Sequence, residues 1–210
     1  MTWTHVVMSS GSTASASFSP TWPSGVQDGD VVVFCMGYAP DGGSSAAITS
    51  ANGWYTTSAG GLAARFMWCR YSAAMPLPAI ALTGGPTATW SMAAFRSTAG
   101  AAFGADYMQD GSPPAATSVT TTTPNTLLVM FGWAVGDQPA GWSLAGGSWS
   151  TLVSLSGGGS GNPNFANVAL AWQQIASPST VSGIYARLVS NRYFLLTAGE
   201  PQSFGGFFHE

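Results

Sequence analysis

The sequence repeats one series of short hydrophobic segments, in the same order, in its two halves. The first series is Gly29–Phe34, Gly53-Trp54, Ala64–Trp68 and Ala88–Met92, and the second is Asn125–Met130, Gly141-Trp142, Val168–Trp172 and Arg192–Leu196. This alignment matches Trp54 with Trp142, Trp68 with Trp172 and Trp90 with Phe194. A repeat of about 100 residues is too long for a solenoid unit. We therefore expect two similar halves that supply strands to the shared core of one β-sandwich.

The segments between turn signals have the composition of β-strands. Glycine and proline interrupt the chain too often for long helices, and the runs between them are rich in Val, Thr, Phe, Trp and Tyr. The predicted strands are Trp3–Ser9, Ala14–Phe18, Asp30–Tyr38, Leu62–Tyr71, Ala79–Leu82, Thr87–Phe95, Thr117–Thr123, Thr126–Val135, Trp149–Leu155, Asn167–Ile175, Ser182–Leu188 and Arg192–Thr197. The sequence predicts an all-β, antiparallel fold.

Alternation along two of these strands predicts which side chains face the core. In Leu62–Trp68 the even positions are apolar and Arg65 points the other way, and the segment that ends at Trp172 repeats this pattern. Alternation with a period of two is typical of a strand with one buried face. We expect Trp68 and Trp172 to be buried at matching positions of the two halves.

The length of 210 residues suits one large β-sandwich. We expect a single domain over 1–210, with repeat halves at about 1–98 and 117–200, a linking segment at 99–116 and a C-terminal tail at 201–210. The linking segment also suits a boundary between two domains. Because each half offers barely enough strands to cover its own apolar faces, we favour one sandwich whose halves exchange strands.

Charged residues are rare in this chain, at 6%, and all five basic residues are arginine. The net charge of −3 and the scattered arginines argue against nucleic-acid binding, which uses a clustered basic face. No apolar run approaches the 20 or so residues of a membrane-spanning helix, so we expect no membrane partner. Cys35 and Cys69 lie inside predicted strands, and we expect two buried, reduced thiols.

No residue pattern points to catalysis or to a bound cofactor. The histidines, His5 and His209, lie near opposite ends of the sequence, where strand-end and tail roles account for them. Most acids, Asp28 and Asp30 among them, lie beside glycine or proline, where carboxylates usually bind turn backbone. We therefore expect no enzymatic activity, no catalytic residue, no metal site and no cofactor.

Two sets of aromatic residues are candidates for recognition. Trp133, Trp142 and Trp149 would stack on sugar rings if exposed, although core or subunit-interface positions are the simpler interpretation. Phe204, Phe207 and Phe208 lie in the C-terminal tail, where an exposed apolar patch usually marks an interaction site. We expect that tail to pack against a neighbouring subunit or particle.

Several motifs resemble a widespread group of tailed-phage virion proteins. These motifs are Val26–Phe34 with its Gly-Asp step, the later Gly53-Trp54, Trp90–Arg96 with an Ala-Phe-Arg strand end, and Thr121–Val129. In the second half, Ala198-Gly199-Glu200 stands where that strand end is expected. The resemblance covers about Pro23 to Thr197 and implies a jelly-roll-like β-sandwich in a minor capsid, head-fibre or tail component. It implies no catalytic residues.

The resemblance sets the functional expectation. We expect a virion structural protein that assembles through protein–protein contacts on the capsid or tail, as a decoration, head-fibre or minor tail component. Its partners would be further copies of itself, most simply in a homotrimer, and the major capsid or tail proteins. The alternative is a carbohydrate-binding module that recognises a host surface glycan.

Overall fold

The computed structural model describes most of the chain and contains only strands and turns there. The described residues are 2–38, 45–50, 52–56, 64–84, 87–98, 104–111, 117–122, 124–135, 144–145, 147–156, 166–186 and 192–199. All pairings between strands are antiparallel. The predicted all-β fold class is confirmed. No described helix is long and apolar enough to cross a bilayer.

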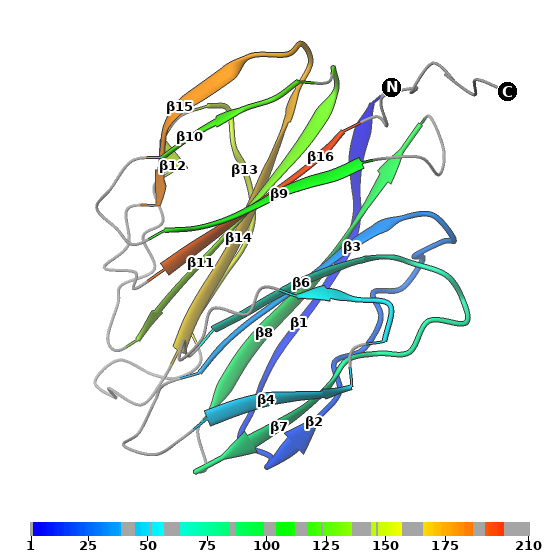
Figure 1. Ribbon diagram of the computed structural model, residues 1–210. Helices are drawn as coiled ribbons and strands as arrows, with labels where there is room; N and C mark the ends of the chain where they lie inside the picture. Colours follow the sequence, from blue (N-terminus) through cyan, green and yellow to red (C-terminus); the bar gives the residue numbers. More distant parts are fainter. Residues whose placement is uncertain are drawn as a thin grey trace, which may run out of the picture.

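The described residues form eight strands in each half of the sequence, and Figure 1 shows how they are arranged. The first half forms β1 (Trp3–Thr13), β2 (Ser17–Phe18), β3 (Val31–Tyr38), β4 (Ser45–Ser50), β5 (Tyr55–Thr56), β6 (Ala64–Arg70), β7 (Ala79–Thr83) and β8 (Ala88–Ser97). The second half forms β9 (Gly104–Gly111), β10 (Thr117–Thr120), β11 (Thr126–Val135), β12 (Leu144–Ala145), β13 (Ser150–Ser156), β14 (Ala166–Ile175), β15 (Thr180–Ala186) and β16 (Arg192–Gly199).

The strand order of the first half recurs in the second half. A five-stranded sheet has the order β1-β8-β3-β6-β5, and the other five-stranded sheet has the order β9-β16-β11-β14-β13, so each strand number rises by eight. The three-stranded sheets, β2-β7-β4 and β10-β15-β12, follow the same rule. Among the described strands, hydrogen-bonded pairing stays within each half. The strand exchange expected from the sequence is therefore absent from the described sheets.

The two five-stranded sheets pack against each other face to face. Phe66 of β6 stacks on Phe131 of β11 with 6.0 Å between ring centroids, and Phe95 of β8 meets Trp172 of β14 at 5.7 Å. Figure 1 shows the three-stranded sheets on the outer sides of this pair, giving four layers. All eight residues of β3 are buried, as a strand covered on both faces requires.

Strand register shows which side chains of the five-stranded sheets face the other half of the molecule. Opposed residues of antiparallel strands point to the same face. Val33 pairs with Trp68, and Val129 pairs with Trp172, so both tryptophans lie on the faces that meet between the halves. Trp68 is buried as predicted, whereas Trp172 is only partly buried against the core.

Two matches proposed in the sequence alignment are wrong. Tyr55 and Ser150 occupy equivalent places opposite Trp68 and Trp172, so the counterpart of Trp54 is Trp149 and not Trp142. The partners of β8 and β16 likewise match Trp90 with Tyr193 and not with Phe194. Sequence alignment misses such shifts because loops of different length precede the equivalent strands. A shift of one residue along a strand moves every side chain to the other face of the sheet.

The segment at 99–116, expected to be a link, contains strand β9 at the edge of the second five-stranded sheet. Glycines bound β9, and its acids Asp106 and Asp110 break any apolar alternation, so its sequence lacks a strand signal. The short strands β4, β5 and β12 were also not predicted. The two-residue strands β5 and β12 are each held by a longer neighbour, β6 and β15.

Cys35 and Cys69 are free and buried, as expected. Register places them on opposite faces of the sheet, because Cys35 opposes Phe66 and Cys69 opposes Val32. A disulfide requires Cβ atoms that point toward each other. Burial raises the pKa of both thiols, which keeps them in the unreactive protonated form.

Candidate functional site

The turn before β3 uses both of its acids to bind backbone. Gly29 has a φ of 93°, which favours glycine, and the Asp30 N–H donates to the Gln27 carbonyl at 3.0 Å. In return, the Gln27 N–H donates to Asp30 Oδ2 at 2.8 Å. The Asp28 carboxylate accepts the Ala73 N–H at 2.8 Å. The expected structural role of these two turn acids is confirmed.

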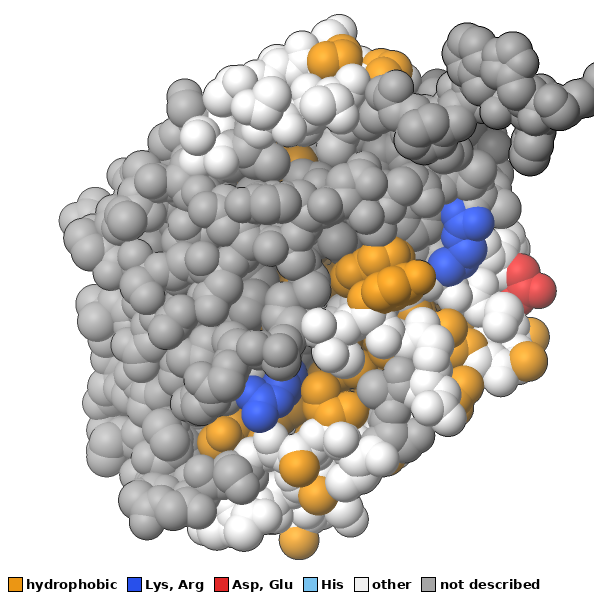
Figure 2. All heavy atoms as spheres, in the orientation of Figure 1, with side chains coloured by type: hydrophobic (Ala, Val, Ile, Leu, Met, Phe, Trp, Pro, Cys, Tyr) orange, Lys and Arg blue, Asp and Glu red, His pale blue; other side chains and the backbone are white. Residues whose placement is uncertain are grey.

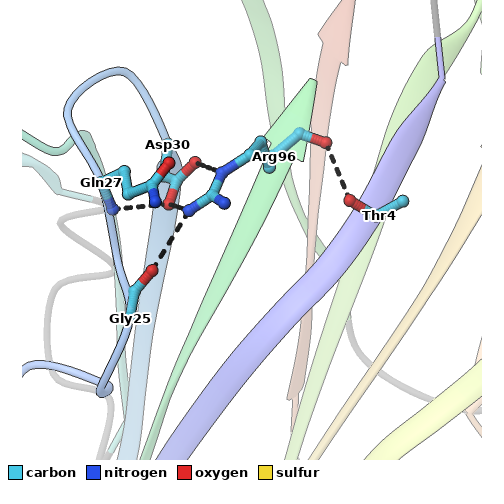
Figure 3. Close-up of polar contacts among 5 residues, drawn as sticks. All are labelled: Thr4, Gly25, Gln27, Asp30 and Arg96. Atoms are coloured by element: carbon cyan, nitrogen blue, oxygen red, sulfur yellow. Dashed lines mark hydrogen bonds and ion pairs between the residues drawn. The ribbon is translucent and has the colours of Figure 1, made fainter. Parts of the chain in front are cut away.

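Arg96, at the end of β8, binds this turn from the neighbouring strand (Figure 3). Its Nε donates to Asp30 Oδ1 and its Nη2 donates to Asp30 Oδ2, both at 2.8 Å, in a two-point contact. The same Nη2 reaches the Gly25 carbonyl at 3.1 Å. The hydrogen bond with Asp30 raises the pKa of Arg96. Two residues that carry the resemblance, 66 positions apart, therefore form one contact.

The second half lacks this contact. The places of Asp30 and Arg96 are taken there by Thr126 and Gly199, as the pairing of β11 with β14 and β16 shows. Positive φ is retained at the turn, since Asn125 has a φ of 55° where the first half has Gly29. The turn conformation is thus common to both halves, whereas the ion pair belongs to the first half alone.

His5 lies on the face of β1 that meets the second half. Its ring is 5.8 Å from that of Phe95, and its Nε2 is buried without a hydrogen-bond partner. Desolvation by burial lowers the pKa of His5, which favours the neutral ring. Within the described residues, no group of three or more His, Cys, Asp or Glu could hold a metal ion. His209 lies outside these residues.

The aromatic candidates from the sequence are only partly described. Trp149 is partly buried, just before β13. Trp133 lies in β11, whose backbone is described there but not that side chain, and Trp142 lies outside the described residues, as do Phe204, Phe207 and Phe208. None of these residues is shown to form a binding surface.

Tyr55 of β5 is an exposed aromatic residue that the sequence did not single out. Its side chain is 61% exposed and stacks on Trp68, with 4.3 Å between centroids and 9° between ring planes. Nothing in its local pattern distinguishes it from a core aromatic, because it follows the buried Trp54 directly. In Figure 2, drawn in the orientation of Figure 1, hydrophobic side chains gather where the strands of the first half lie.

A second aromatic cluster supports the strand that carries Tyr55. Trp54 donates its Nε1–H to the Pro76 carbonyl at 3.0 Å. Trp22 stacks on Trp54 at 5.5 Å and meets Tyr71 edge-on at 4.8 Å. These contacts hold β5 against β6 although only Tyr55 and Thr56 form its ladder.

Comparison of the chain with family models, with curated proteins and with solved structures gives no match.

Proposed function

We propose that this protein is a non-enzymatic structural component of a tailed-phage virion, a jelly-roll-like protein that acts in capsid decoration, in a head fibre or in the tail. The observation that supports this most is the Asp30–Arg96 contact. It joins two of the motifs behind the resemblance and gives them an architectural role. A residue pair used to hold a turn against a strand suits a protein whose task is to be a stable building block.

Arg65 and Asp28 also bind backbone groups and so connect neighbouring segments of the first half. Arg65 donates from Nη1 to the Ala64 carbonyl at 2.9 Å and from Nη2 to the Ala46 carbonyl at 2.8 Å, which ties β6 to β4. Asp28 binds a backbone N–H of the 72–78 connection. Such contacts favour an assembly role, in which the outer surface and loops meet neighbouring subunits.

Localisation in the virion is tested by mass spectrometry of phage particles purified through a density gradient. We expect the protein to co-purify at a fixed copy number relative to the major capsid protein. A non-virion phage protein from the same lysate serves as the control for carry-over. Abundance in the lysate together with absence from the particles would reject the proposal.

Self-association, with a homotrimer as the expected state, is tested by light scattering on the purified protein. Removing Phe204–Glu210 should weaken association and leave the β-sheet circular dichroism signal unchanged, because this apolar tail is expected to contact a neighbour. An intact protein that remains a monomer, with or without the tail, would contradict this part of the proposal.

A further inference from the structure

Comparison of equivalent positions in the two halves shows which aromatic residues occur in both and which occur in only one. Trp68 and Trp172 occupy matching places, as do Trp54 and Trp149. Tyr55 has no aromatic counterpart, because Ser150 stands opposite Trp172. The second half therefore builds the same strand pairing without an aromatic residue at this position.

The ring of Tyr55 is both exposed and held in place. Among the described residues it is the large hydrophobic side chain that stays exposed, at 61%. Parallel stacking on the buried Trp68 covers one face of the ring and leaves the other face directed away from that support. A flat ring that is already ordered loses little rotamer freedom when a ligand binds.

The surroundings of Tyr55 suit a small, flat, hydroxyl-rich ligand better than a protein. Thr56 follows Tyr55 along β5 and is paired with Met67, so its exposed side chain lies on the opposite face and leaves the ring of Tyr55 unobstructed. Arg70 lies two residues beyond Trp68 on the same face of β6. A protein contact of ordinary size buries about 800 Å² on each side around an apolar centre, whereas a single exposed ring on the same face as the Arg70 guanidinium matches one sugar unit.

We propose that Tyr55, backed by Trp68, is a stacking platform for a pyranose ring of a polysaccharide. The C–H groups on one face of the sugar would lie on the electron-rich face of the tyrosine ring. A hydroxyl group at the rim of the sugar would accept a hydrogen bond from the Arg70 guanidinium, which lies on the same face of the sheet. This inference goes beyond the virion role and concerns a binding site on the isolated protein.

The test uses the purified full-length chain and an array of bacterial capsular polysaccharides, lipopolysaccharides and cell-wall glycans, followed by titration of the strongest binder. Tyr55→Ala removes the ring, and Tyr55→Leu keeps an apolar cover over Trp68 but lacks a flat face. Tyr55→Phe keeps the ring, and Thr56→Ala is the matched neighbouring control. Thermal unfolding checks that each variant is folded.

We expect the wild type to bind at least one glycan. Tyr55→Ala and Tyr55→Leu should weaken that binding by at least about tenfold, and Tyr55→Phe should change it by less than about threefold. Failure of the wild type to bind any glycan would overturn the proposal. So would equal binding by Tyr55→Leu, or a variant that loses self-association instead, which would make Tyr55 a subunit contact. Absence of the protein from phage particles would reject the virion role and leave this result unaffected.

Discussion

Asp30 is a buried acid whose carboxylate is bound by several hydrogen-bond donors. Its carboxylate is 2% exposed and receives hydrogen bonds from the Gln27 N–H and from two Arg96 nitrogens. A buried charge without its partner is costly, because it has lost its hydration without compensation. The side chain of Arg96 is 35% exposed, so solvent screens the attraction and reduces its contribution.

Replacing Arg96 with methionine should lower the free energy of unfolding by about 1–3 kcal/mol, because the Asp30 carboxylate stays buried with fewer donors. The double variant Asp30→Asn, Arg96→Met should lose less stability than the sum of the two single variants. Urea unfolding of the four proteins measures this coupling. Strict additivity would show that the contact contributes nothing.

His5 makes stability depend on pH. Burial lowers its pKa in the folded protein, so the unfolded chain binds more protons once the pH falls below the ordinary value of about 6.5. Stability should therefore decrease as the pH falls from 8 to 5.5. The decrease should be smaller in His5→Asn, which cannot titrate, and chemical unfolding at both pH values measures it. An identical decrease in the variant would exclude His5 as its source.

At the scale of elements, the edge strands β1 and β9 have a β-bulge at equivalent positions. In β1, His5 pairs with Phe95 and Val7 with Ala94, which leaves Val6 as the extra residue of a bulge. In β9, Ala105 pairs with Ala198 and Tyr107 with Thr197, which leaves Asp106 in the equivalent place. A bulge bends and twists its strand locally. Its recurrence indicates that both edge strands need this bend.

The bulge predicts how β1 tolerates deletions. Deleting Val6 leaves the partners of His5 and Val7 unchanged, so the fold should persist with a loss of about 1–3 kcal/mol from the missing apolar side chain. Deleting Ser9 shortens the strand equally but moves Val7 and Met8, which pack against the core, to opposite faces. Unfolding midpoints should rank Ser9 deletion as clearly the more harmful. The reverse ranking would contradict the register.

At the scale of the whole molecule, one hydrophobic core crosses the boundary between the halves. It joins Val33 and Phe66 of the first half to Val129, Phe131 and Leu170 of the second. Trp3 adds two polar links, since its N–H donates to Gln174 Oε1 at 2.9 Å and its Nε1–H to the Asn125 carbonyl at 2.7 Å. The halves therefore share apolar faces, although none of the described sheets contains strands of both halves.

This shared core predicts that the two halves unfold together. Calorimetry should show one transition whose van't Hoff and calorimetric enthalpies agree. Phe131→Ala, at a fully buried ring between the halves, should destabilise that single transition by about 3–5 kcal/mol, whereas Ser118→Ala at an exposed position should have little effect. Two separate transitions in the wild type would show that the halves are independent.

The sequence by itself determined the fold class, most of the long strands and the burial of Trp68. These features depend on neighbours within a few residues, because alternation and turn chemistry are local. The sequence also indicated a repeat, but the alignment misplaced the counterparts of Trp54 and Trp90. The two halves have loops of different length, and the sequence alone does not show where the extra loop residues lie.

Only the tertiary structure decided which strands pair, that Asp30 meets Arg96, that β9 completes an edge, and that Tyr55 stays exposed while Trp54 beside it is buried. Each of these depends on contacts between residues far apart in the chain. Such contacts are selected by the packing of whole sheets, in which many burial and hydrogen-bond terms are satisfied together. The short strand β5 has no strand signal of its own, and its place is set by Trp68 and Trp22.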